Sequence, residues 1–240
     1  MWPRSICAPS RDNDEELRLH GRVVNLPARC VSYRTAWVDD DYLLEVAGEV
    51  RQARVFGENL VLRRRISTWL GSNRIEIEDS VTNEGFLPQP DMILYHFNLG
   101  FPLVGANARL QDAAEQSIPR EADAQAGLAH WSSFQPPTPG YREQVFRYVP
   151  KAGRDGNVRV ALENLDLGLE LRLTYEREQL PHLFQWKMMG EGTYVLGIEP
   201  TTAAQSRAVL EFTSAARAVS TGWRSKSSSH PKVLRLQRKS

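Results

Sequence analysis

The sequence contains no run of about 18 apolar residues, the length at which a helix begins to span a bilayer. Its first 21 residues lack a long apolar stretch before a small-residue cleavage site, so we expect no signal peptide. Only two cysteines occur, Cys7 and Cys30, and they form neither a CxxC pair nor a disulfide framework. These absences lead us to expect a protein of the reducing cytoplasm with no membrane partner.

Metal-ligand clusters are also missing. The five histidines are scattered and the cysteines are unpaired, so no group has the spacing of a zinc site. Heptads and repeats of fixed period are absent too. We therefore expect neither a metal nor another cofactor.

The length and composition are those of an ordinary globular protein. The chain has 240 residues, of which 41% are apolar and 25% are charged. A chain of this length buries about 70% of its unfolded surface and needs no disulfide or metal for stability. It is long enough for one large all-β domain or two small domains.

Charge is distributed unevenly along the chain. Residues 203–240 hold eight Lys/Arg and one acid, Glu211, for a net charge of +7. Because the whole chain carries +1, residues 1–202 carry −6. A basic tail on an acidic body could bind nucleic acid. A solvated, poorly ordered tail fits the composition better, so we expect a folded domain over 1–202, a disordered tail over 203–240 and no nucleic-acid partner.

The body of the chain has the pattern of β-strands. Apolar or alternating segments are separated by Gly, Asn and Pro, and no helical periods lie between them. Residues 105–140 differ and predict a long irregular excursion with one short helix. The pattern indicates an antiparallel sandwich or barrel. The expected strands are Tyr42–Val50, Asn59–Leu70, Arg74–Val81, Met92–Phe97, Asn157–Glu163, Leu167–Tyr175, His182–Met188, Thr193–Ile198 and Ala208–Thr213.

Two polar residues are expected to close apolar strands. His96 ends one strand, and Glu199 ends another, where Pro200 would stop the ladder. If they meet at one rim of a sheet, they could divide acid and base work between them. The simpler alternatives stay open, because a strand-end His is more often a packing residue and a Glu before Pro is more often exposed.

Three segments resemble the aldose 1-epimerase (galactose mutarotase-like) superfamily, in the same order along the chain. His20-Gly21 is similar to the LHG segment of these enzymes. The run Tyr95–Leu99 (YHFNL) resembles their NH-x-YFNL segment, and Gly197–Pro200 (GIEP) resembles their CLEP segment. The longer forms, LYHFNLGFP and MGEGTYVLGIEPTT, look closest to an uncharacterised bacterial branch. The resemblance covers roughly 15–202 and implies a large antiparallel β-sandwich.

The resemblance also implies roles for individual residues. In that family the His of the second segment protonates the ring oxygen of the sugar, and the Glu of the third takes the proton of the C1 hydroxyl. Carried over, His96 is the acid and Glu199 the base, while His20 binds the sugar near its ring oxygen. The implied activity is interconversion of sugar anomers by an isomerase that acts on a small-molecule sugar.

Other residues are candidates for substrate binding. Arg22 and Lys187 could donate to sugar hydroxyls, or to a carboxylate or phosphate on a modified sugar, although each could equally be a surface charge. Trp186 could stack on a sugar but is more often core. Asp91 could bind a hydroxyl or make a turn, and Asn98 could contact ligand or bond locally.

The chain departs from the family pattern at both ends. Only 19 residues precede His20, where the family has several strands and a substrate-contacting arginine. We therefore expect a sandwich that lacks N-terminal strands and is incomplete at its C-terminal end, with open edges that a homodimer could cover. A non-catalytic carbohydrate-binding protein on the same fold is the alternative function.

Overall fold

The computed structural model describes residues 10–12, 15–17, 20–89, 92–111, 114–202 and 232–239. By internal contacts the chain divides into two compact units. The first unit is Met1–Met92 with Ala203–Val233, and the second is Ile93–Thr202 with Leu234–Ser240.

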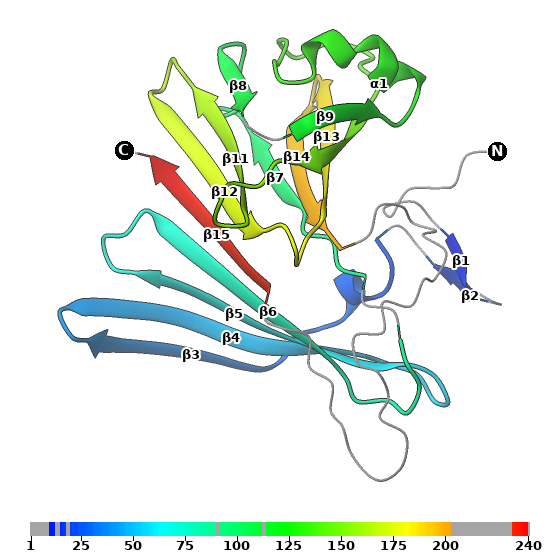
Figure 1. Cartoon of the computed structure of the whole chain (residues 1–240), viewed down its shortest axis with the longest axis vertical. Coiled ribbons are helices and arrows are strands. Elements are labelled where there is room, and N and C mark those ends of the chain that lie inside the picture. Colours follow the sequence, from blue (N-terminus) through cyan, green and yellow to red (C-terminus); the bar gives the residue numbers. More distant parts are fainter. Residues whose placement is uncertain are drawn as a thin grey trace. The chain divides into compact units, whose positions relative to one another are not determined.

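The first unit is built on an antiparallel meander of four strands (Figure 1). They are β3 (Arg29–Val38), β4 (Asp41–Ala53), β5 (Asn59–Trp69) and β6 (Arg74–Asn83). Each is joined to the next by a hairpin, with pairs running from Leu43↔Trp69 to Ala53↔Asn59 between β4 and β5. A short pair, β1 (Ser10–Asp12) and β2 (Glu15–Leu17), and the 3₁₀ turn η1 (Val23–Asn25) precede them. The strands expected at 42–50, 59–70 and 74–81 are thus present.

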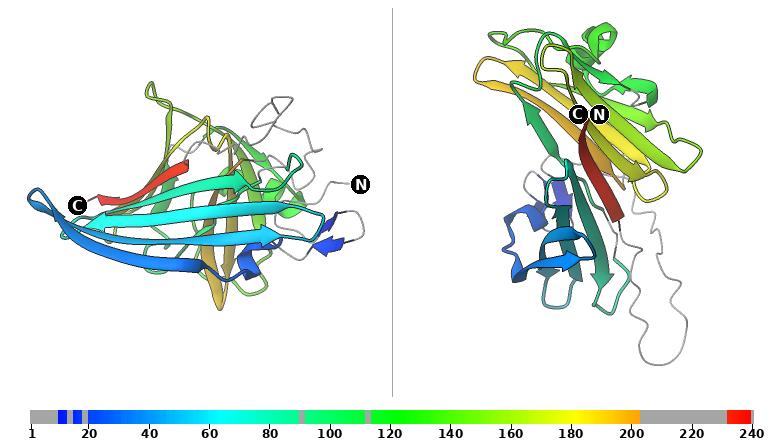
Figure 2. Two further views of the ribbon diagram at one scale, coloured as in Figure 1. Left: turned by 90° about the horizontal axis from the view of Figure 1, so that it is seen from below. Right: turned by 90° about the vertical axis from the view of Figure 1, so that its left-hand side faces the viewer.

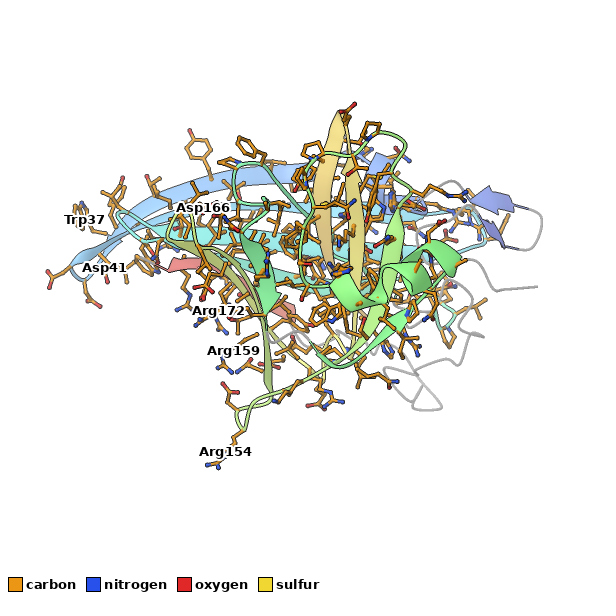
Figure 3. The ribbon with its side chains drawn as sticks, turned by 90° about the horizontal axis from the view of Figure 1, so that it is seen from above. Trp37, Asp41, Arg154, Arg159, Asp166 and Arg172 are labelled. Carbon is orange, nitrogen blue, oxygen red and sulfur yellow. The ribbon has the colours of Figure 1, made fainter. Side chains whose placement is uncertain are left out.

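The β3–β4 hairpin was not anticipated from the sequence. Trp37 stacks edge-on against Tyr42 across its tip, with ring centroids 5.1 Å apart. Figure 3 shows Trp37 and Asp41 at this end of the meander. Asp39 adopts a φ of 54°, the left-handed conformation that Asp tolerates better than most residues and that a tight two-residue turn requires.

The second unit is a sandwich of two antiparallel sheets. One sheet has the order β7-β14-β13-β10-β9, and the strands facing it have the order β15-β12-β11-β8. Figure 2 shows these layers from two further directions. The strands are β7 (Phe97–Gly100), β8 (Ala108–Gln111), β9 (Ala114–Pro119), β10 (Gln144–Pro150), β11 (Asn157–Asn164), β12 (Leu169–Glu176), β13 (His182–Gly190), β14 (Thr193–Thr201) and β15 (Lys232–Lys239). The expected all-β antiparallel sandwich is confirmed.

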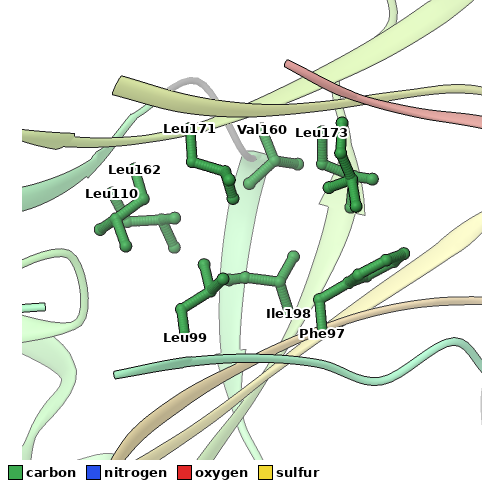
Figure 4. Close-up of a pocket in the computed structure, with 9 residues that line it drawn as sticks. Phe97, Leu99, Leu110, Val160, Leu162, Leu171, Leu173 and Ile198 are labelled. Carbon is green, nitrogen blue, oxygen red and sulfur yellow. The ribbon is translucent and has the colours of Figure 1, made fainter. Parts of the chain in front are cut away.

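The core of the second unit lies between these two layers. Phe97, Leu99 and Ile198 project from one sheet toward Leu110, Val160, Leu162, Leu171, Leu173 and Leu236 on the other (Figure 4). The period-two alternation of β11 and β12 places these apolar residues inside. Arg159 and Arg172 therefore point to the opposite face (Figure 3).

The middle excursion holds the expected short helix, α1 (Ala122–Ala126), followed by the 3₁₀ turn η2 (Leu128–His130). It is more regular than expected, because β8 and β9 also fall inside it. These two strands are four and six residues long and hold few large apolar residues, so the sequence did not predict them.

Two expected strand boundaries were wrong. The segment 92–97 is not a strand: only Leu94 makes an isolated bridge, to Thr201, and β7 begins at Phe97. Pro200 does not end the other strand, because β14 continues to Thr201 with Pro200 paired to Leu183. Proline lacks the N–H, but its carbonyl still accepts from the N–H of Tyr95 at 3.0 Å.

The C-terminal segment is the other departure from expectation. Residues 232–239, expected to be part of a disordered tail, form β15, which pairs with β12 from Tyr175↔Leu234 to Glu170↔Lys239. The strand expected at 208–213 lies outside the described residues. Of the helices that the structure describes, none is long and apolar enough to cross a membrane.

Candidate active site

The five-stranded sheet has two faces of different character. Residues directly opposite each other on antiparallel strands point to the same face. Leu183, Gln185 and Lys187 share the core face with Ile198, and each of these three is 1% exposed or less. Phe184 and Trp186 lie on the other face, opposite Glu199 and Gly197 respectively. We call this second face the Glu199 face.

His96 and Glu199 meet on the Glu199 face. His96 precedes Phe97, which pairs with Ile198, so continuing the register places His96 opposite Glu199. The Nε2 atom of His96 lies 3.1 Å from Oε1 of Glu199. The Glu199 side chain is 6% exposed and the His96 side chain 26%. A nearly buried carboxylate therefore contacts an imidazole that solvent can reach.

Backbone and hydroxyl groups fix the chain just before His96. Ile93 donates its N–H to Oγ1 of Thr202 at 3.0 Å, and its carbonyl accepts from Oγ1 of Thr201 at 2.9 Å. These bonds hold an irregular segment in register with the end of β14. The position of His96 is thus set by the strand that carries Glu199.

Electrostatics couple the two side chains. The pKa of His96 is raised above its usual value, chiefly by its hydrogen bond to Glu199. Burial of the imidazole acts in the opposite direction, and the charge of Glu199 and the Asn98 side chain add to the rise. Contact with Glu199 therefore favours the protonated form of the imidazole.

Gly197 and Trp186 complete the surroundings of the pair. A Cβ atom at Gly197 would lie 2.9 Å from Cε1 of His96, 3.0 Å from Oε1 of Glu199 and 3.2 Å from Cβ of Trp186. Only glycine leaves room for this arrangement. The Trp186 ring meets His96 edge-on at 5.8 Å between centroids, and its indole N–H donates to Oε2 of Glu143 at 2.8 Å.

The sequence could not assign these roles. Gly197 is part of the GIEP segment, but glycine in a strand usually marks a bulge or a close approach of some kind. Glu143 has no sequence feature that links it to Trp186. The available signal was the spacing of Gly197 and Glu199. They are two residues apart in a strand, and residues at that spacing share a face.

Asn98 is the other predicted residue that lies near the pair. It pairs with Gly197 across β7 and β14, and its exposed side chain contributes to the raised pKa of His96. The structure thus brings together three of the seven predicted site residues.

Lys187 is not brought to this face, which corrects our expectation for it. It follows Trp186 directly, and successive residues of a strand point to opposite faces. Its ammonium is buried, donates to the carbonyl of His130 at 2.9 Å and lies 5.7 Å from the centre of the Phe134 ring. Burial lowers the pKa of Lys187 to about 8.

His20 and Arg22 belong to the first unit. His20 is exposed and adopts a φ of 66°, followed by Gly21 at 74°, in a turn. Arg22 lies 3.3 Å from Oε1 of Glu58, a carboxylate that is 4% exposed and also binds Arg54 at 2.6 Å. Arg22 therefore has a structural partner within its own unit. Asp91 lies outside the described residues.

Two hollows among the described residues do not include the pair. One is the apolar gap of the sandwich core, and the other is a surface depression over β4, β5 and β6 that Cys30 also lines. Within the described residues, no group of three or more His, Cys, Asp or Glu side chains is arranged to hold a metal.

Residues 3–226 match a protein family whose description is "Domain of unknown function (DUF4432)". The chain belongs to this family. No curated protein matches this DUF4432 chain.

Solved structures identify the fold of this DUF4432 chain. A candidate aldose 1-epimerase from Klebsiella pneumoniae superposes with a TM-score of 0.81 at 24% identity, covering 96% of this chain and 59% of that one. A galactose mutarotase-like protein from Clostridium acetobutylicum gives 0.64 at 15% identity, over 99% and 77% of the two chains. A galactose mutarotase related enzyme from Lactobacillus acidophilus gives 0.56 at 11%, over 99% and 80%.

At these identities the likeness establishes the galactose mutarotase-like fold, as the sequence resemblance implied. The chain spans 59% of the length of the Klebsiella protein. Activity does not follow from the fold, because one fold carries many functions.

Proposed function

We propose that this protein binds an aldose on the Glu199 face and interconverts its two anomers, with His96 as general acid and Glu199 as general base. The observation that supports this most directly is the 3.1 Å distance between Nε2 of His96 and Oε1 of Glu199. Ring opening of a hemiacetal moves one proton off the C1 hydroxyl and one onto the ring oxygen. These two oxygens share one carbon, so the acid and the base must lie close together.

The proposed step conserves protons. Glu199 takes the proton of the C1 hydroxyl, the bond between C1 and the ring oxygen breaks, and His96 donates its proton to that oxygen. The open-chain aldehyde then rotates about its C1–C2 bond. The reverse transfers close the ring on the other side of C1 and return both side chains to their starting states.

Each side chain suits its part. The raised pKa of His96 favours the protonated form of the imidazole, which is the form that a general acid needs. Glu199 is almost wholly removed from water, and its Oε1 lies 3.1 Å from the imidazole of His96, so both groups can contact the same C1 centre. The half-buried Trp186 beside His96 offers an aromatic surface of the kind that packs against the C–H groups of a sugar.

Anomer exchange by saturation-transfer NMR, with a panel of aldoses, tests the proposal. We expect the wild-type protein to accelerate exchange, and Glu199→Gln and His96→Asn each to slow it by about 100-fold or more. Glu199→Gln keeps the shape of the side chain, so sugar binding should survive. Glu176→Gln is the matched control, because Glu176 is an exposed carboxylate on β12, outside the five-stranded sheet.

The same spectra separate the two functions that the fold allows. Sugar binding without any acceleration by the wild-type protein would reject the isomerase and favour a carbohydrate-binding protein. Exchange that is equally fast in wild type and Glu199→Gln would remove Glu199 from the mechanism.

A further inference from the structure

Arg147 lies in the same cross-strand row as Glu199. Arg147 of β10 pairs with Phe184 of β13, and Phe184 pairs with Glu199 of β14. All three therefore project from the Glu199 face. Two strand spacings separate the backbones of Arg147 and Glu199, which is roughly 10 Å. A pyranose with one substituent could extend from one side chain to the other across Phe184.

Within the part of the chain that the structure describes, no anion pairs with the Arg147 guanidinium. The side chain is half-buried and makes no hydrogen bond or ion pair with another described residue. Two carboxylates at the start of β10 pair with a different arginine: Glu121 and Glu143 contact Arg120, at 2.5 and 3.4 Å. A guanidinium partly removed from water without a counter-ion costs free energy that a bound anion would recover.

His182 adjoins Arg147 on the same face. It lies opposite Thr201 and two residues before Phe184, which makes it the diagonal neighbour of Arg147. Burial, and secondly the positive charge of Arg147, lower the pKa of His182 below its usual value. A neutral imidazole beside a guanidinium can donate a hydrogen bond to an anion without bringing a competing negative charge.

We propose that Arg147 and His182 form a subsite for an anionic substituent, so that the aldose held at Glu199 is an acidic sugar. Its carboxylate or phosphate lies on the side of the ring remote from C1. This inference rests on the proposed function for the placement of C1. It goes beyond that function in naming the substrate class and a specificity-determining arginine.

Calorimetric titration with glucose, glucuronate and glucose 6-phosphate at one ionic strength tests the subsite. We expect the wild-type protein to bind at least one of the two acidic sugars about tenfold or more tightly than glucose, because charge-assisted hydrogen bonds to a guanidinium are strong. The better of the two identifies the substituent as carboxylate or phosphate. Arg147→Met should abolish the preference, and Arg147→Lys should restore part of it.

Arg142→Met is the matched control, since it removes one arginine charge from the exposed segment just before β10 and should keep the preference. A wild-type protein that binds glucose as tightly as both acidic sugars overturns the subsite. So does an Arg147→Met variant that keeps the preference. If Arg147→Met does not fold, the subsite is tested by the preference of the wild-type protein for acidic sugars and by the change of that preference in Arg147→Lys.

Failure of this inference is distinguishable from failure of the proposed function. Exchange of glucose anomers without any preference for acidic sugars would reject the subsite alone. Preferential binding of an acidic sugar without exchange of its anomers would reject the isomerase alone.

Discussion

Gly197 lies so close to His96 that a Cβ at position 197 would stand 2.9 Å from the imidazole Cε1. The same Cβ would stand 3.0 Å from Oε1 of Glu199, so one missing methyl group makes room for both members of the pair. Gly197 and Glu199 are two residues apart on β14 and therefore share a face, so the space left by the glycine is directly beside the pair.

Gly197→Ala is therefore expected to separate His96 from Glu199. We expect it to lower the free energy of unfolding by about 1–3 kcal/mol through overpacking, and to move the pKa of His96 toward its ordinary value. Urea unfolding and NMR titration measure the two effects. Gly100→Ala is the control, because its nearest contact, the carbonyl of Tyr194, would lie at 3.6 Å. Equal behaviour of the two variants would contradict the tight fit.

Glu199→Gln should lower the pKa of His96, since the hydrogen bond to Glu199 is the main cause of its rise. The folded-state pKa of His96 lies above the unfolded value of about 6.5. Protonation of His96 therefore stabilises the fold fully below that value, and this contribution is lost as pH rises through the folded pKa. An NMR titration of wild type and variant measures both values. An unchanged His96 pKa in Glu199→Gln would show that the 3.1 Å contact does not control it.

Arg147→Gln should raise the pKa of His182, though only part of the way to its ordinary value. The guanidinium charge is the second cause of the shift, and burial, the larger one, remains. The imidazole signals of wild type and Arg147→Gln across pH 4 to 8 provide the measurement. A His182 pKa that does not respond would place Arg147 too far away to share a subsite with it.

Lys187 should make stability rise with pH. Its folded-state pKa is about 8, below the unfolded value of 10.5, so the unfolded chain binds more protons between these values. We expect the free energy of unfolding to increase by about 1–3 kcal/mol from pH 8 to 10 through this group. Lys187→Met should remove the rise and leave anomer exchange unaffected, because Lys187 lies on the opposite face from Glu199.

Denaturant unfolding of wild type and Lys187→Met at pH 8 and pH 10 provides the comparison. Lys151→Met, at an exposed lysine just after β10, should keep the wild-type pH response. A Lys187→Met variant that stays folded but loses exchange activity would show that Lys187 contributes to the active site.

Local patterns identified much of the fold. The alternation of Leu167–Tyr175 and the apolar run of Thr193–Ile198 predicted β12 and β14, because a half-buried or buried strand leaves its period in the sequence. Residues 29–38 and 232–239 were missed as strands. β3 is mostly exposed and β15 is rich in Lys and Arg, so neither has the apolar composition of a buried strand. Their strand conformation depends on a neighbour that pairs with them.

The sequence by itself determined that the chain is all-β, that it resembles the galactose mutarotase-like proteins, and that His96 and Glu199 are the residues to examine. Only the tertiary structure decided which side chains share a face with them. Trp186 and Lys187 are adjacent in the chain, yet the pleat of β13 sends one toward His96 and the other into the core. Arg147 is more than 50 residues from either catalytic candidate, and only the pairing of three strands brings it into their row. Strand pairing is non-local, so it leaves no short-range pattern in the sequence.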